Sequence, residues 1–289
     1  DVVERDGAWT VLAERPAGQR RAPWDVGEVA VVEGRRTLVV GVGRVGRSEL
    51  QDVADLADEA VAGVREVWGP GWDDGAGTRA VVVVPATTAD LGALLGRDVD
   101  RLDQIAAVAT AEGAGTGTGA ARVWVHRSVM ASLTPLGRLI VMRHELLHVA
   151  TGPAATSATP LWLEEGLAEY VGYRGSGVPV RVVAGDVLPA LASGRLRALP
   201  ADDDFDAASR SLASAYERAW LVCRYVASRW GEQALLAWYR AVAAGDPGEG
   251  QANVEAALAS ALGTDRAAWM RGLRAYLERT AASGGAVRS

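Results

Sequence analysis

The sequence predicts an α+β fold in which a mixed β-sheet lobe precedes a mainly helical lobe. Over residues 37–126, apolar runs of strand length are separated by glycine-rich segments and by one long amphipathic stretch. Over residues 136–278, apolar residues recur instead at helical spacing. Strands gathered in the first half and helices in the second are typical of α+β proteins. A chain of 289 residues is long enough for one large domain or for two lobes around a shared cleft.

Three regions are predicted along the chain. Residues 1–36 form an irregular lead-in with room for a hairpin, because proline and glycine interrupt its short apolar runs. Residues 37–150 form the α+β lobe, and residues 151–289 form the helical lobe. The residues of the lead-in predict no role for it.

The sheet lobe is predicted to contain four strands and a long helix. Residues 48–67 carry apolar side chains at helical spacing, and Ser48 and Gln51 are typical of a capping box at the start of that helix. Residues 80–84, an alanine and four valines, are typical of a strand buried on both faces. The predicted strands are residues 37–42, 80–84, 105–110 and 123–126, the last two joined by a flexible run at 113–119.

Gly41-Val42-Gly43-Arg44-Val45-Gly46 spells G-x-G-x-x-G, a fingerprint of dinucleotide-binding folds. We interpret these glycines as a loop. The capping box begins the next helix at Ser48, beyond all three glycines, so the helix N-terminus would not meet a pyrophosphate. The following strand begins only at Ala80, too late to supply an acidic residue about 20 residues further on.

Composition excludes several classes of function. The net charge is −6 and no block of like charge dominates, so nucleic acid is not an expected partner. Cys223 is the single cysteine, which rules out an internal disulfide and a cysteine-based zinc knuckle. No apolar run reaches the ~20 residues that a membrane-spanning helix needs. The chain begins at Asp1 without a methionine, and we expect a trimmed start and a secreted or cell-surface location.

His144-Glu145-Leu146-Leu147-His148 is a complete H-E-x-x-H motif, on a helix predicted over residues 137–150. Histidines four residues apart lie on one face of a helix, so both imidazoles can reach one metal ion. Glu145 lies beside that face and can reach a water at the metal without being a ligand. Only three histidines occur in the chain, so a chance match to the motif is rare. The third, His126, ends a predicted strand and is expected at the surface.

A second helix is predicted to supply the third protein ligand that a zinc site needs. It follows a short loop, with Thr159 as N-cap and Pro160 at its first position, and so folds back against the first helix. Three acidic residues compete for the role of ligand. They are Glu164, Glu165 and Glu169.

Glu165 and Glu169 are four residues apart on one face of this helix, whereas Glu164 points about a quarter-turn away. We predict Glu165 as the ligand and Glu169 as the acceptor of a free N–H group of a ligand histidine. Gly166 inside the helix costs about 1 kcal/mol relative to alanine, which indicates close packing against a neighbouring helix.

These motifs resemble the gluzincin metallopeptidases, most closely the aminopeptidase N and "peptidase MA-like" branch. The H-E-x-x-H is followed by Trp162-Leu163-Glu164-Glu165-Gly166-Leu167-Ala168-Glu169-Tyr170, similar to the W-L-x-E-G-x-A segment that carries the third ligand in that branch. Ala215-Tyr216-Glu217-Arg218-Ala219 is similar to the Y-E-K-G segment of aminopeptidases. The resemblance covers roughly residues 136–230 in its motifs, and before that only the architecture.

The resemblance implies a zinc-dependent peptidase with its Zn²⁺ in the cleft between the lobes. His144, His148 and Glu165 would bind the metal, and Glu145 would activate a metal-bound water that hydrolyses the peptide bond. Tyr216 would stabilise the oxyanion. The G-x-M-E-N signature, which holds a free amino terminus in aminopeptidases, is missing. The nearest sequence is Ala111-Glu112-Gly113, so exopeptidase action does not follow from the resemblance.

The expected partner is a peptide or protein substrate, which could pair as an added strand with residues 105–110 or 123–126. The alternative is a catalytically inactive, zinc-containing peptide-binding module of peptidase descent. Glu145 argues against that alternative, because a purely structural zinc site would not require it. A nucleotide-binding function is disfavoured by the position of the glycines described above.

Overall fold

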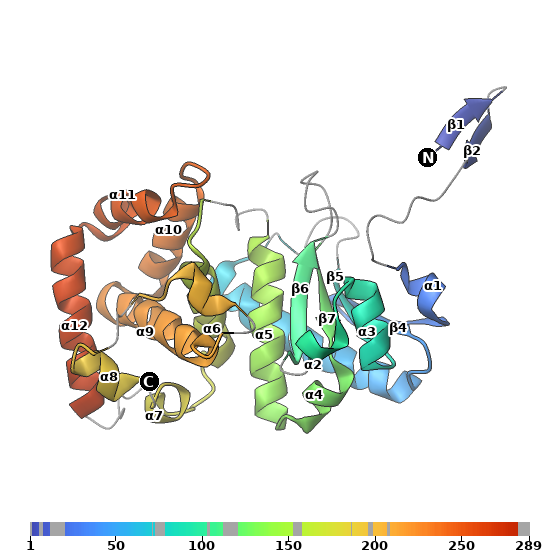
Figure 1. The fold of residues 1–289 in the computed structure, drawn as a ribbon, viewed down its shortest axis with the longest axis horizontal. Coiled ribbons are helices and arrows are strands. Elements are labelled where there is room, and N and C mark those ends of the chain that lie inside the picture. The colour runs from blue at the N-terminus through green and yellow to red at the C-terminus, as the bar shows by residue number, and fades with distance from the viewer. Residues whose placement is uncertain are drawn as a thin grey trace.

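The computed structural model has a mixed α/β architecture, with a five-stranded mixed sheet and a helical half beside it (Figure 1). Helix α5 (Pro135–Thr151) lies between the sheet and the helical half. The structure describes residues 2–5, 8–11, 21–70, 72, 79–102, 105–111, 121–152, 158–185, 187–195, 199–206 and 209–282.

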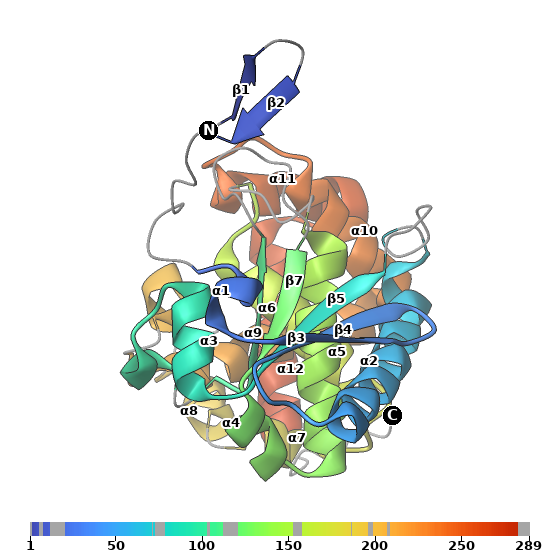
Figure 2. The same ribbon diagram turned by 90° about the vertical axis from the view of Figure 1, so that its right-hand side faces the viewer.

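The sheet has the strand order β3-β4-β5-β7-β6. Its three central strands are parallel, whereas the edge strands β3 and β6 are antiparallel to their neighbours. Side chains alternate between two buried faces: Val82 and Val84 pack with α2 and α5, and Val83 packs with α3. Figure 2 shows α3 on one side of the sheet and α2 with α5 on the other. The bounds are β3 Val29–Glu33, β4 Thr37–Val42, β5 Ala80–Pro85, β6 Ala107–Ala111, β7 Ala121–Val125, α2 Arg47–Trp68 and α3 Thr88–Leu95.

Four of the five strands of this sheet correspond to predicted strands. The two strands predicted at 105–110 and 123–126 are shifted by up to two residues. The fifth, β3, lies within the segment predicted to be irregular, and it pairs with β4. Separately, β1 (Val2–Arg5) and β2 (Ala8–Val11) form a two-stranded antiparallel sheet. The run predicted at 113–119 lies outside the described residues.

The prediction of a capping box at Ser48 is wrong. Helix α2 begins at Arg47 with Gly46 as its N-cap, and no side chain caps it. Residues 43–46 form a loop between β4 and α2, as expected, and α2 starts beyond all three glycines. Gly43 has a φ of +82°, and a Cβ there would lie 2.9 Å from the Cβ of Ala86. This glycine therefore permits a close backbone approach.

The helical half is built around α6, which packs against α5 on one side and α9 on the other. No described helix is both long and apolar enough to cross a membrane. The longer helices of this half are α6 (Leu161–Tyr173), α9 (Leu212–Trp230), α10 (Glu232–Ala243), α11 (Gly250–Leu262) and α12 (Arg266–Ala282). The shorter elements of the chain are α1 (Pro23–Val26), α4 (Arg127–Ser132), α7 (Val180–Val183), α8 (Leu188–Ala192) and the 3₁₀ turns η1 (Val99–Arg101) and η2 (Asp202–Phe205).

Candidate metal centre

Helix α5 brings the two histidines of the motif together. The helix starts at Pro135, and the Thr134 side chain caps it by accepting a hydrogen bond from the Gly137 N–H. One turn apart on the same face, His144 and His148 have their Nε2 atoms 3.1 Å from each other. His144 is buried and His148 is half-buried.

Helix α6 adds one carboxylate to this pair. The Glu165 Oε2 atom lies 3.1 Å from His144 Nε2 and 3.3 Å from His148 Nε2. The helix begins one residue later than predicted, at Leu161, and its N-cap is Pro160 instead of Thr159. The structure thus brings together the three residues predicted as ligands. Their role as ligands stays a prediction.

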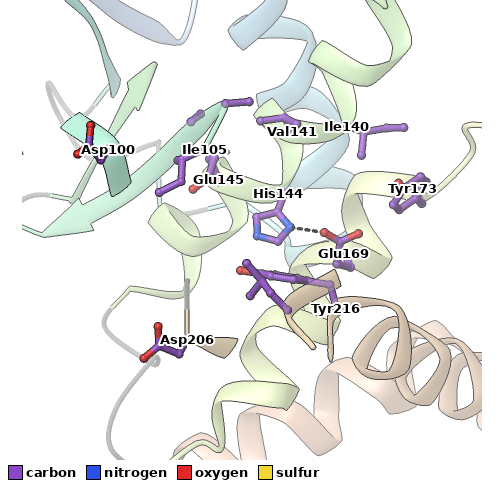
Figure 3. Close-up of a pocket in the computed structure, with 13 residues that line it drawn as sticks. Asp100, Ile105, Ile140, Val141, His144, Glu145, Glu169, Tyr173, Asp206 and Tyr216 are labelled. Carbon is purple, nitrogen blue, oxygen red and sulfur yellow. Dashed lines mark ion pairs between the residues drawn. The ribbon is translucent and has the colours of Figure 1, made fainter. Parts of the chain in front are cut away.

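Glu169 contacts the other nitrogen of His144, with its Oε1 atom 3.2 Å from Nδ1 (Figure 3). A carboxylate at this distance favours a proton on Nδ1, which leaves the lone pair of Nε2 directed at the other two groups. Histidines that bind metals are commonly held by such a carboxylate on their second nitrogen. Glu169 is therefore placed where it could orient His144, and its predicted role as acceptor of a ligand histidine's N–H stays a prediction.

The three facing atoms suit a metal ion. Two imidazole nitrogens and one carboxylate oxygen all lie within 4.8 Å of one another, so this group could hold a metal ion. Zinc ligands about 2.0–2.1 Å from a tetrahedral ion are about 3.3 Å apart, close to the observed separations. Electron-rich atoms at such distances repel one another unless a proton or a cation lies between them.

The electrostatics of the cluster also favour positive charge. Burial alone would raise the pKa of Glu165, but its contacts with His144 and His148 outweigh this and hold the pKa well below its usual range. Burial would lower the pKa of His144, yet the contacts with Glu165 and Glu169 raise it well above its usual value. The site therefore attracts a proton or a cation.

Glu145 lies on the sheet side of the cluster (Figure 3). Its Oε2 atom accepts a 2.7 Å hydrogen bond from the backbone N–H of Ala109 in the edge strand β6. Burial raises the pKa of Glu145, although His144 and His148 oppose the shift. A carboxylate with a raised pKa takes up a proton more readily, which suits a general base.

Tyr216 of α9 is on the helical side of the cluster. Its ring centroid is 6.1 Å from that of His144, and the ring of Phe205 packs against it edge to face at 5.3 Å. Burial and the carboxylates of Glu165, Glu145 and Glu169 raise the pKa of Tyr216. The phenol therefore keeps its proton and can act as a hydrogen-bond donor at neutral pH.

A cleft of about 590 Å³ opens beside the cluster. Its walls carry somewhat more apolar than polar surface, and no arginine is among the described residues that line it. Four of them carry carboxyl groups, which disfavours a negatively charged ligand. The lining residues are Asp100, Ile105, Ala106, Ala107, Ile140, Val141, His144, Glu145, Glu169, Tyr173, Asp206, Leu212 and Tyr216.

Several other polar residues lie apart from the cluster. Glu164 lines a separate pocket with Thr159 and Asp202, and burial raises its pKa to about 7. The expectation that His126 is a surface residue is wrong: it is 3% exposed, and its Nε2 atom lies 2.9 Å from Thr88 Oγ1. The end of a strand is often exposed, but here Thr88 at the start of α3 packs against it.

The contact from Ala109 was not predicted from the sequence. The donor is a backbone N–H, so the residue type at position 109 gives no sign of the contact. The contact also requires β6 to lie against α5. Of the weak match at Ala111-Glu112-Gly113, Ala111 ends β6 and the other two residues lie outside the described part of the chain.

A scan against models of known protein families gives no match for this chain, and no curated protein sequence matches it significantly. The function is therefore inferred from the residues of the site.

The glycine at 166 controls how closely α6 approaches α9. A Cβ at this position would lie 2.6 Å from the Ala219 backbone oxygen and 3.0 Å from Cys223 Sγ. The close packing expected of this glycine is therefore present, and the neighbouring helix is α9.

We expect Gly166→Ala to lower the free energy of unfolding by about 2 kcal/mol, since overpacking outweighs the ~1 kcal/mol gain in helix propensity. Denaturant unfolding would measure it. Gly46→Ala is the control for overpacking, because a Cβ there has no atom within 4 Å; we expect it to cost no more than about 1 kcal/mol, the loss of a favourable N-cap residue of α2. A variant as stable as the wild type would contradict the packing account.

Proposed function

We propose that this protein is a zinc-dependent peptidase of the gluzincin type. The observation that carries the proposal is the meeting of His144 Nε2, His148 Nε2 and Glu165 Oε2, with Glu145 beside them on an open cleft. Two imidazoles and one carboxylate are the protein ligands of many catalytic zinc sites, which keep a further position open. A metal with a purely structural role would instead have four protein ligands.

Zinc fits this donor set better than harder cations. Calcium and magnesium prefer oxygen ligands, whereas imidazole suits zinc and some transition metals. When bound, zinc would polarise the scissile carbonyl and lower the pKa of the attacking water towards ~7. His144 is held for this task by Glu169, and Glu165 supplies one negative charge.

Glu145 is proposed as the general base. It would take a proton from the attacking water and pass it to the nitrogen of the leaving amine. Two features support this role. Burial raises the pKa of its carboxyl, and the Ala109 N–H fixes one carboxylate oxygen, which leaves the other to face the cleft.

The peptide is proposed to pair with β6. Two strands are predicted as candidates for pairing with the substrate. Of these, β7 has a neighbouring strand on each side, whereas β6 lies at the edge of the sheet. The outer side of an edge strand offers backbone groups to an extended peptide. In β6 the Ala109 N–H already binds Glu145, so the pairing is proposed for the other backbone groups of that edge. β6 also packs against α5 and lines the cleft through Ala107, which favours it over β7.

Tyr216 is proposed to donate a hydrogen bond to the oxyanion. We expect Tyr216→Phe to retain zinc and to lower kcat/KM about 10²–10³-fold, the usual cost of removing one such donor. Peptide cleavage assays on zinc-loaded protein would measure it. Tyr276→Phe in α12, outside the cleft, is the matched control. Unchanged kcat/KM in Tyr216→Phe would remove this residue from the mechanism.

The proposal is tested by measuring bound zinc and peptide cleavage on the same sample of the wild-type protein. We expect about one zinc per chain by elemental analysis, cleavage of a broad peptide library, and loss of cleavage on chelation with recovery on adding zinc. Zinc without cleavage of any library peptide would favour the inactive peptide-binding module. Absence of zinc from folded, zinc-supplied protein would overturn the proposal.

A further inference from the structure

The C-terminal end of α6, three turns from its start, is held by polar contacts from three other helices. The Glu232 carboxylate, at the start of α10, accepts hydrogen bonds from Arg174 Nε at 2.7 Å and from the Tyr170 hydroxyl at 3.1 Å. Arg174, the C-cap of α6, also donates to Glu66 of α2 at 2.9 Å. Its backbone oxygen accepts a 3.2 Å bond from Arg143 of α5.

Glu232 is the centre of this cluster because a single oxygen atom, Oε2, receives both donors from α6. Its side chain is 23% exposed, so solvent competes weakly for these bonds. Bonds to a carboxylate are shorter and stronger than those between neutral groups. Two attachment points on one helix, at Tyr170 and Arg174, restrain both its rotation and its movement along its axis.

The same helix carries the acidic residues of the metal centre. Tyr170 directly follows Glu169, and Glu165 lies little more than one turn earlier. Close packing at Gly166 and Gly172 sets how near α6 comes to α9 and to α5. The polar contacts at the end of the helix add a directional restraint on its rotation.

Small rotations of α6 matter because metal coordination tolerates little displacement. A carboxylate that lies about 6 Å from the helix axis would be displaced by about 2 Å if the helix rotated by about 20°. Metal–ligand distances are held to within about 0.2 Å. A loosened α6 would therefore take Glu165 away from the two histidines and Glu169 away from His144 Nδ1.

We propose that Glu232 is a positioning residue for the metal centre, which sets the rotation of α6 through Tyr170 and Arg174 and so determines metal affinity. This inference rests on the proposed zinc site. The two residues that donate to Glu232, Tyr170 and Arg174, are neither predicted metal ligands nor part of the described cleft lining, so Glu232 is proposed to act through the helix that bears the ligands.

The test is the zinc affinity of Glu232→Ala, measured by competition with a chromophoric chelator. We expect a loss of about tenfold or more, comparable with the loss of groups that orient metal ligands. Glu232→Gln should keep most of the affinity, because its amide oxygen still accepts both bonds. Thermal unfolding of the zinc-free proteins, measured in parallel, separates affinity from general stability.

The matched control is Glu255→Ala, which breaks another glutamate–arginine contact, with Arg266, between α11 and α12. It should leave zinc affinity unchanged. If Glu232→Ala does not fold, Tyr170→Phe replaces it. That change removes one donor, and we expect an affinity loss of between about twofold and tenfold.

Zinc affinity within twofold of the wild type in Glu232→Ala, or no change in Tyr170→Phe, would overturn the positioning role. A drop in the stability of zinc-free Glu232→Ala with unchanged affinity would do the same, since it would show a merely structural contact. Failure of the wild type to bind zinc would overturn both this inference and the proposed function. Zinc binding by the wild type therefore distinguishes failure of the positioning role from failure of the proposed function.

Discussion

His148→Ala is expected to abolish both zinc binding and peptide cleavage. The change removes one of the three predicted ligands and leaves His144 and Glu165. Catalytic zinc sites use three protein ligands. Elemental analysis of zinc-supplied protein would measure the loss of the metal. Thermal unfolding with and without zinc gives a second readout, because a ligand at 100 times its Kd stabilises the native state by about 2.7 kcal/mol.

The control for His148→Ala is His126→Ala, which removes the one histidine outside the cluster. We expect that variant to keep its zinc, even if loss of the contact with Thr88 lowers its stability. Full zinc content in His148→Ala, together with zinc-dependent stabilisation equal to that of the wild type, would show that the metal is bound elsewhere.

Glu145→Gln is expected to keep its zinc and to lose most of its peptidase activity. The amide has nearly the same shape as the carboxylate and can still accept the Ala109 N–H bond, so the fold should not change. It cannot take a proton from water at neutral pH, and the loss of a general base typically lowers the rate about 10²–10⁴-fold. Zinc analysis and kcat/KM on the same sample would measure both effects.

Glu255→Gln, on an exposed helix face, is the matched control and should cleave at the wild-type rate. Wild-type cleavage by zinc-loaded Glu145→Gln would remove this residue from the mechanism and leave the base unassigned. Loss of zinc in the same variant would instead indicate that Glu145 contributes to metal binding.

Much of the candidate site is local and could be predicted from the sequence. His144 and His148 meet because residues four apart share a helix face, and Pro135 and Thr134 begin that helix without help from the rest of the fold. The pairing of Glu165 with Glu169 on α6 follows from the same spacing. The buried valines of β5 likewise predict a central strand from composition alone.

Other features depend on contacts between distant segments. Residues 29–33 look irregular in the sequence and become β3 only because β4 offers an edge to pair with. His126 is buried because α3 folds over the end of β7, which its neighbours in sequence do not reveal. The Ala109 N–H reaches Glu145 only because β6 is the edge strand that lies against α5.

The sequence by itself determined that two imidazoles and a carboxylate pair lie on two successive helices, because helical spacing is a local property of the chain. Only the tertiary structure decided which carboxylate faces the histidines: Glu165 and Glu169 face α5, whereas Glu164 lines another pocket. The physical reason is that the rotation of α6 is set from outside the helix. Close packing of Gly166 on α9 and of Gly172 on α5, with the bonds to Glu232, leaves one orientation.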